Sequence, residues 1–253
     1  DQRIPVYIIR DQHYEDRSNL VASLFIPQTF LTIVPDIPLG SPKSDKNYYN
    51  RAEAHQVGWC LRNAQKRFPS QPVIIIKDSS ICVADPQTIS DIITSTLSLS
   101  VGKETFHLCY LCRWMDKCQL YSNRKSIPGT TTGVVRTQSP HGIQALLFTT
   151  QGRDTILGKL PMNNGKLFQA RDSLSETFNR EIVAGNLTAL CIVPNLMEYD
   201  IRLASRDCDY LKSNACAPIP VLHQQSSSVN IYVAFIIVVI LLIVLVWAAA
   251  YVA

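Results

Sequence analysis

Short apolar runs alternate along the chain with segments whose apolar residues recur every three or four positions. Ile4 to Ile9 form the first apolar run, and residues 16–25 after it have helical spacing. Residues 30–36 form a second run, and residues 50–68 again carry apolar positions at helical spacing. Continuous apolar runs of this length are typical of strands buried on both faces. The pattern predicts two successive β–α units.

The strongest strand signal is the run PVIII at residues 72–76. Asp85 and Pro86 then indicate a helix start, because Asp caps backbone amides and Pro fits the first turn. Residues 106–114 (FHLCYLCRW) supply a fourth strand. Strands alternating with helices predict an α/β domain with a mainly parallel sheet and flanking helices. Ligands bind beyond the carboxyl ends of such strands, so the turn after residue 76 is the expected site.

The C-terminal segment, residues 231–253, contains no charged side chain. A helix of this length, rising 1.5 Å per residue, crosses a hydrocarbon layer about 30 Å thick. We therefore expect one C-terminal transmembrane helix. Residues 221–230 are Ser- and Gln-rich and typical of a linker, so residues 1–220 are predicted to form the globular domain. Because no signal-like run opens the chain, we expect insertion after synthesis, with the domain on the cytosolic side.

Composition and charge narrow the function classes further. Apolar residues make up 47% of the chain and charged residues 17%, which is too apolar for a disordered chain and low in charge for a wholly soluble one. The net charge is +4, but the Lys and Arg residues are scattered and form no basic stripe. Nucleic-acid binding is therefore not expected.

The eight cysteines all precede the predicted linker. A domain facing the cytosol keeps cysteines reduced. Cys208 and Cys216 flank a short polar stretch and are close enough in sequence to close a small loop. The cysteine count does not decide whether they form a disulfide. The triplet Asn186-Leu187-Thr188 matches the N-glycosylation pattern, but on the expected side of the membrane it would remain unmodified.

Four potential zinc ligands lie in one stretch: His107, Cys109, Cys112 and Cys118. A buried strand explains this stretch better than a zinc site, with His107 and Cys109 on one face and Cys112 on the other. Buried cysteine is a common small core residue. A redox role for Cys109 and Cys112 is also disfavoured, because reactive pairs of this spacing lie at helix N-termini.

The order of elements from Ile4 to about Asp200 resembles glycosyltransferase family 25, the lipopolysaccharide and procollagen-type sugar transferases. Residues 57–61 (VGWCL) resemble the family's Gly-containing helix, and residues 72–81 (PVIIIKDSSI) resemble the strand that ends in its Glu-Asp-Asp motif. Residues 128–147 are similar to its Gly-Thr-rich segment. The resemblance implies a GT-A-like fold that binds a nucleotide sugar, with a divalent metal held by acidic side chains at the donor diphosphate.

The residues that match the family's catalytic positions have changed. Lys77, Asp78 and Ser79 stand at the acidic motif, so one carboxylate of three remains. At 4 Å and an effective dielectric of 20, an ammonium repels a cation by about 4 kcal/mol per unit charge. Asn163 and Asn164 match a later acidic segment, and amides cannot act as a general base near neutral pH.

These losses favour an inactive, membrane-anchored glycosyltransferase-like domain with a structural role. We expect neither a metal nor another cofactor. The expected partners are a lipid bilayer, through residues 231–253, and neighbouring structural or capsid proteins. By analogy with large DNA viruses, the hypothesis is a minor capsid protein that links an internal virion membrane to the capsid shell, located in that membrane or in the host endoplasmic reticulum.

The alternative is an active, metal-independent glycosyltransferase that moves a hexose from a nucleotide sugar. Lys77 or Arg62 would then take over the role of the metal at the diphosphate, because Lys binds phosphate as a point charge. Asp78 would contact the donor ribose or the acceptor, with Asn163 and Asn164 as further candidates. The simplest account of Lys77 and Asp78 is a solvated strand end, and an ordinary turn explains the two asparagines.

Overall fold

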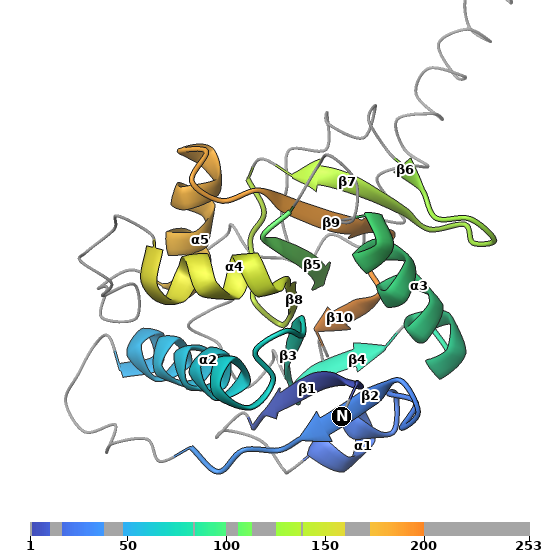
Figure 1. Ribbon diagram of the computed structural model, residues 1–253, viewed down its shortest axis with the longest axis horizontal. Helices are drawn as coiled ribbons and strands as arrows, with labels where there is room; N and C mark the ends of the chain where they lie inside the picture. Colours follow the sequence, from blue (N-terminus) through green and yellow to red (C-terminus); the bar gives the residue numbers. More distant parts are fainter. Residues whose placement is uncertain are drawn as a thin grey trace, which may run out of the picture. The chain divides into compact units, whose positions relative to one another are not determined.

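A mixed eight-stranded sheet with helices on both faces forms the centre of the computed structural model (Figure 1). The structure describes residues 2–10, 17–37, 48–82, 84–99, 106–112, 125–137, 139–159 and 173–199. All of these lie in the first of the two units into which the chain divides, Asp1–Ala217. The predicted α/β class is confirmed for this part of the chain.

The strand order in the large sheet is β2-β1-β3-β8-β5-β9-β7-β6. The strands are β1 (Ile4–Ile9), β2 (Phe30–Ile33), β3 (Val73–Lys77), β5 (Leu108–Cys112), β6 (Lys125–Ser126), β7 (Gly133–Thr137), β8 (Ala145–Phe148) and β9 (Ala189–Val193). Neighbouring strands are parallel in the β2-β1-β3 group and in the β5-β9 pair. The sheet is nevertheless mixed, because β8 and β7 run antiparallel to both of their neighbours.

The antiparallel strand β8 lies between β3 and β5 and determines which residues meet at the end of β3. Ile76 is paired with Ala145, and Val73 with Phe148. The residue before β8, Gln144, consequently lies beside the last residue of β3. Its carbonyl oxygen accepts a hydrogen bond from the Lys77 amide at 2.8 Å. The start of one strand and the end of another thus share the same sheet edge.

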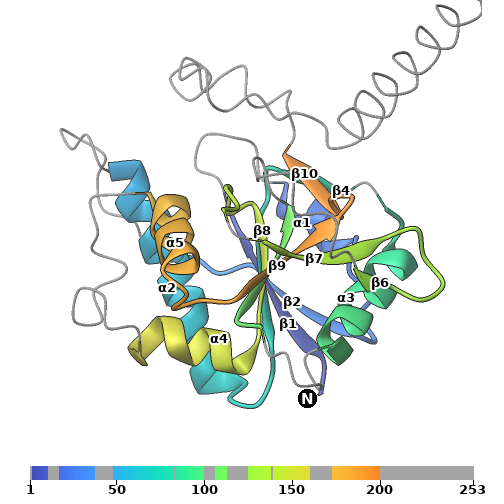
Figure 2. The ribbon, with the colours of Figure 1, turned by 90° about the horizontal axis from the view of Figure 1, so that it is seen from above.

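The helices form one layer on each side of the sheet (Figure 2). They are α1 (Ser18–Ala22), α2 (Tyr48–Arg67), α3 (Pro86–Leu99), α4 (Thr150–Asp154), which continues into a π-helical turn (Thr155–Lys159), and α5 (Leu174–Val183). The predicted helix start at Pro86 is confirmed, since Asp85 accepts hydrogen bonds from the amides of Gln87 and Thr88, both at 3.0 Å. The helix predicted over residues 16–25 is confirmed only as the short α1.

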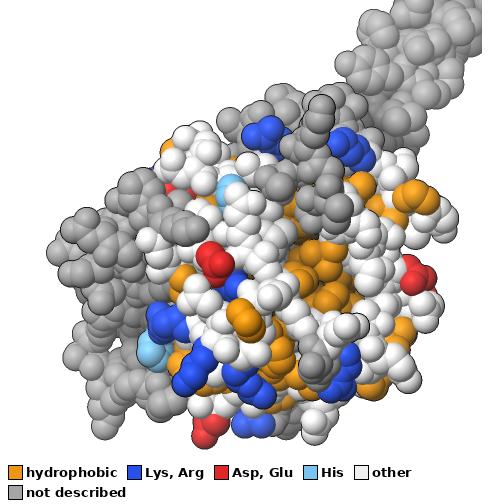
Figure 3. All heavy atoms as spheres, in the orientation of Figure 1, with side chains coloured by type: hydrophobic (Ala, Val, Ile, Leu, Met, Phe, Trp, Pro, Cys, Tyr) orange, Lys and Arg blue, Asp and Glu red, His pale blue; other side chains and the backbone are white. Residues whose placement is uncertain are grey.

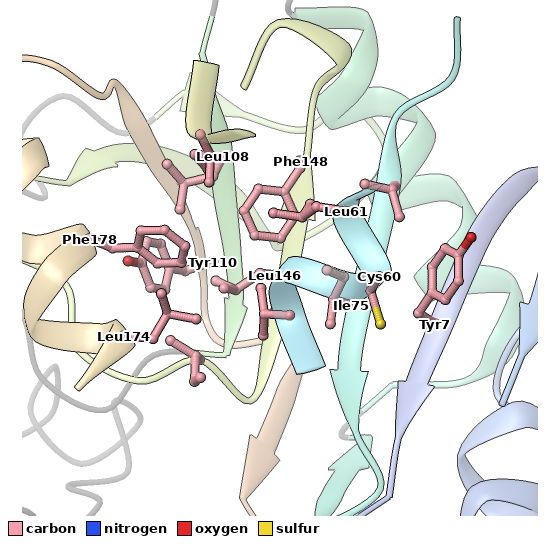
Figure 4. Close-up of a cluster of buried hydrophobic side chains, with 14 of the residues drawn as sticks. Tyr7, Cys60, Leu61, Ile75, Leu108, Tyr110, Leu146, Phe148, Leu174 and Phe178 are labelled. Carbon is pink, nitrogen blue, oxygen red and sulfur yellow. The ribbon is translucent and has the colours of Figure 1, made fainter. Parts of the chain in front are cut away.

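Alternate residues of the same strand enter two separate hydrophobic cores. Tyr7 and Ile75 belong to a buried cluster beneath α2 and α5 that includes Leu61 and Phe178 (Figure 4). The other core contains Ile8, Ile74 and Ile76, together with side chains of α1 and α3. The central strands are therefore buried on both faces, as their continuous apolar sequences predict.

Two short strands form a second sheet that sequence analysis did not predict. β4 (Ser80–Cys82) and β10 (Met197–Tyr199) are antiparallel, with Met197 opposite Cys82. β4 begins directly after the turn that follows β3. Its pairing with β10 therefore holds residues 78–79 between two strands instead of in an open loop.

A buried arginine fixes the connection between α2 and β3. Arg153 is 1% exposed, and its guanidinium donates to the carbonyl oxygens of Phe68, Pro69 and Gln71 at 2.6–3.2 Å. Its Nε also contacts the Asp154 carboxylate at 3.0 Å. Because buried carbonyl groups need hydrogen-bond donors, this contact ties the C-terminal end of α2 to α4.

Several predicted features lie outside the described residues. They include the linker at 221–230, the membrane segment at 231–253 and the residues Asn163, Asn164, Cys118, Cys208 and Cys216. Among the residues that are described, no helix has the length and apolar character needed to cross a bilayer.

We predict that Gly152→Ala destabilises the protein, because the added Cβ would overlap with the backbone carbonyl group of His107. The expected loss in the free energy of unfolding is about 3 kcal/mol, measured by urea denaturation. Gly158→Ala is the matched control, since its Cβ would meet no atom within 4 Å. It should leave stability unchanged or raise it by up to about 1 kcal/mol, because Ala favours helix. Equal effects of the two variants would contradict this packing.

Candidate functional site

The structure places Lys77, Asp78 and Ser79 at the carboxyl ends of the parallel strands. Lys77 is the last residue of β3 and is paired with Ile9, the last residue of β1. The Asp78 amide donates to the carbonyl oxygen of Ile9 at 2.9 Å. On the other side of β3, the Gln144 carbonyl oxygen accepts from the Lys77 amide. The ends of two parallel strands and the start of β8 thus meet at the edge where α/β sheets bind ligands. We call Lys77, Asp78, Ser79 and Gln144, together with Glu53, the edge cluster.

Lys77 forms an ion pair with Glu53 of α2. Ile75 points into the core beneath α2, so Lys77, two residues further along the strand, projects on the same side. The side chains of Lys77 and Glu53 are 18% and 20% exposed. Sequence analysis missed Glu53, although it is the one acidic residue in the sequence of α2. The ammonium at the strand end is therefore compensated from within the chain.

Asp78 differs from the predicted solvated strand end. It is only 1% exposed, and the neighbouring Ser79 and Ser80 are also buried. The turn is enclosed because β4 follows it at once and pairs with β10. The one carboxylate that remains from the expected acidic motif is consequently shielded from solvent in this conformation.

Two further polar atoms of the edge cluster are buried. Within the described part of the chain, Ser79 Oγ and Gln144 Oε1 have no hydrogen-bond partner. Ser80 Oγ, by contrast, donates to the Gln144 carbonyl oxygen at 3.2 Å. Buried polar atoms are normally hydrogen-bonded. The buried side of this sheet edge therefore contains polar atoms to which no described residue forms a hydrogen bond.

Arg62 does not join the edge cluster. It follows Glu53 by nine residues on α2, which is about 13 Å along the helix axis. Its neighbour Asn63 accepts a hydrogen bond from the hydroxyl of Tyr7 at 2.7 Å, so this part of α2 lies over the middle of β1. Burial raises the pKa of Tyr7 to about 12, with a smaller contribution from Cys60, and the phenol therefore remains a donor.

The stretch that contains His107, Cys109 and Cys112 forms part of the fold, as the preferred interpretation of a buried strand predicts. The His107 Nδ1 accepts a hydrogen bond from the Thr188 amide at 2.9 Å, and the thiols of Cys109 and Cys112 are buried. Both thiols lie in the core beneath α3, because the pairing of β5 with β8 shifts between Tyr110 and Cys112. The prediction that these cysteines face opposite sides is therefore wrong. The described residues contain no group of three metal-ligating side chains suited to a metal ion.

On the face of the molecule drawn in Figure 3, the charged side chains of the described residues lie at several separate positions. In Figure 3, Lys and Arg side chains are spread over this face, several of them along its lower edge, and hydrophobic side chains are exposed near its centre. This distribution agrees with the scattered basic residues of the sequence.

No protein-family model and no curated protein matches the chain. Among solved structures, it is similar to an apo UDP-glucose pyrophosphorylase at 6% identity and a TM-score of 0.34, covering 74% of this chain and 72% of that one. It is also similar to a Bacillus anthracis protein assigned as a glucose-1-phosphate thymidylyltransferase, solved with sucrose. That match has 16% identity, a TM-score of 0.32 and coverage of 72% and 65%. Similarity at this level carries no inference about function, and membership of family 25 stays a prediction.

We predict that stability falls in mildly acidic solution through His107. Burial lowers the pKa of His107 in the folded protein, so the unfolded chain binds more protons there. The contribution of neutral His107 to the free energy of unfolding is complete above the ordinary pKa of 6.5. It is lost as the pH falls from 6.5 through the lowered pKa of the folded protein. Protonation also removes the acceptor for the Thr188 amide.

The measurement is the free energy of unfolding between pH 7 and pH 5. His107→Asn, a neutral side chain that can accept a hydrogen bond, should flatten the pH dependence. His55→Asn, at an exposed histidine of α2, is the control for the replacement itself. A profile that is the same in wild type and His107→Asn would contradict the assignment.

Proposed function

We propose that the described α/β domain is a glycosyltransferase-like domain that does not carry out metal-dependent sugar transfer and acts as a binding or structural module. The observation that carries the proposal is the ion pair between Lys77 and Glu53 at the carboxyl end of β3. The family resemblance implies a metal held by acidic side chains at this strand end. An ammonium that already has a carboxylate partner occupies this position instead.

The charge balance of the edge cluster supports the proposal. A divalent metal needs several oxygen ligands and a net negative surrounding. The Lys77–Glu53 pair is neutral as a unit, so it offers a dication no net attraction. Asp78 is shielded, and rotating it outward would expose the enclosed turn between β3 and β4. Within the described part of the chain, the residues at this strand end therefore do not fit the metal that the resemblance implies.

The same geometry weakens the case for metal-independent transfer. An ammonium has three donors, so Lys77 could contact a donor diphosphate while paired with Glu53, but its full positive charge would act there only after the pair separates. Arg62 lies about 13 Å further along α2. Neither cation is therefore placed to take over the role of a metal. A binding or structural role requires no such rearrangement.

A membrane-anchored structural role is the finer part of the proposal. It rests on the uncharged segment 231–253, which has the length of a transmembrane helix. A domain attached to a bilayer in this way would bind neighbouring proteins, of which a capsid shell around an internal virion membrane is the specific hypothesis. Sugar chemistry would not be needed in this setting.

We predict that the full chain in detergent neither hydrolyses nor transfers sugar from UDP-glucose or UDP-galactose in the presence of Mn²⁺. We also expect no saturable Mn²⁺ binding below about 1 mM by isothermal titration calorimetry, a limit that corresponds to roughly 4 kcal/mol of binding free energy. Turnover above the rate of a heat-denatured sample would contradict the proposal.

Lys77→Glu should create Mn²⁺ binding at least about 10-fold tighter than in the wild type. Two adjacent carboxylates, Glu53 and the new one, would then favour a dication, and a gain of 1.4 kcal/mol is enough for this change. Lys77→Gln removes the ammonium without adding a carboxylate and should give a smaller gain. Unchanged Mn²⁺ affinity in both variants would show that Lys77 does not determine the charge of the site.

For the membrane role, we predict that the full chain stays in the membrane fraction after extraction with alkaline carbonate. A chain ending at residue 230 should appear in the supernatant, because the apolar segment is removed. Gel analysis of both fractions measures the distribution. Release of the full chain by carbonate would contradict a transmembrane anchor.

A further inference from the structure

The segment that leads into β8, residues 139–142, is held to α5 by the side chain of Asn179. The Nδ2 atom of this asparagine has three hydrogen-bonding neighbours. They are Ser139 Oγ at 3.1 Å, the Pro140 carbonyl oxygen at 3.2 Å and His141 Nε2 at 3.1 Å. The His141 ring is half-buried at this contact. Three successive residues of the segment therefore converge on one amide group of the helix.

These contacts require a neutral ring at His141. A backbone carbonyl oxygen can only accept hydrogen bonds, so the Pro140 carbonyl needs the amide nitrogen of Asn179 on this side. In the opposite orientation of the amide, two carbonyl oxygens would face each other at 3.2 Å. Because the amide nitrogen can only donate, His141 Nε2 must be an acceptor. This is the case only in the neutral ring that carries its proton on Nδ1.

We propose that His141 is a pH-sensitive switch: its neutral ring joins segment 139–142 to α5, and protonation opens this contact. The protonated ring has a hydrogen on both nitrogens, so two donors would then face each other. Rotation of the Asn179 amide would give the ring an acceptor but would turn an oxygen toward the Pro140 carbonyl. Rotation of the ring away from α5 would break the contact itself. Either adjustment removes a hydrogen bond that holds the segment.

The segment connects this contact to the edge cluster. The amide of Gly142 donates to Ser175 Oγ on α5 at 2.9 Å, and the positive φ of 97° at this position favours glycine. Two residues later, the Gln144 carbonyl oxygen accepts from the Lys77 amide. Opening at His141 therefore loosens the chain three residues before the carbonyl that borders the end of β3.

The charged groups of the neighbouring elements have other contacts. On α5, Glu176 accepts from the backbone amide at the start of the helix, Glu181 accepts from an amide side chain in the turn that follows, and Arg180 is exposed. At the sheet edge, Lys77 and Glu53 form an ion pair. Among the described residues, no carboxylate lies within ion-pair distance of the imidazole ring. Within this part of the chain, no negative charge at the ring offsets its protonation.

The first measurement is the tautomer of His141 in the full chain in detergent at pH 8. Nitrogen–proton NMR correlations of the ring distinguish the two neutral forms. We expect the proton on Nδ1 and a lone pair on Nε2. A ring with its proton on Nε2 would overturn the inference, because it could not accept from Asn179. This result does not depend on any variant that fails to fold.

The second measurement is the protection of the Gly142 amide against hydrogen exchange, compared by NMR at pH 7 and pH 5. Protection should fall about 5-fold at the lower pH, the effect of losing one hydrogen bond. It is expressed relative to the Leu146 amide in the centre of the sheet, so that destabilisation of the whole domain through His107 cancels. In His141→Gln, which cannot be protonated, this ratio should be the same at both pH values.

Asn179→Asp tests the direction of the effect. A carboxylate accepts hydrogen bonds and attracts the protonated ring, so relative protection of Gly142 should be at least as high at pH 5 as at pH 7. His55→Gln, at an exposed histidine of α2, is the matched control and should behave like the wild type. A wild type without a fall, a fall that persists in His141→Gln, or an equal fall in Asn179→Asp would each overturn the inference.

Discussion

The central strands are buried on both faces, and this burial limits where polar side chains can lie. Because α2 and α5 cover one face and α1 and α3 the other, successive residues of β1 and β3 enter different cores. A polar side chain within these strands would have to be buried without water. The polar residues of the edge cluster therefore lie where the strands end.

At the edge, the position of α2 determines which charge faces Lys77. The hydrogen bond from Tyr7 to Asn63 holds the helix over β1, and Arg153 holds the loop that follows it. Glu53, closer to the start of the helix, is thereby placed at the end of β3. The positive charge at the end of β3 is thus compensated by a carboxylate of the same chain.

The sequence predicts those elements whose signals are local. The strand at Ile4–Ile9 is an uninterrupted apolar run bounded by polar residues. Asp85 caps the helix that begins at Pro86 by accepting hydrogen bonds from the amides of Gln87 and Thr88, which follow it closely in sequence. The direction of β8 could not be predicted, because an apolar run buried on both faces looks the same in either orientation. The shift in β5 reverses the side of Cys112, and the pairing of β4 with β10 joins residues more than a hundred positions apart.

The partner of Lys77 also could not be predicted, because the contact joins a helix and a strand that no short motif connects. We propose that this ion pair leaves the end of β3 unable to hold a dication. Paramagnetic broadening of amide NMR signals by Mn²⁺ measures whether a dication binds there. We predict that the amides of Lys77, Asp78 and Gln144 broaden no more than exposed amides on α3. Selective loss of these three signals at low Mn²⁺ concentration would show that the end of β3 does bind a dication.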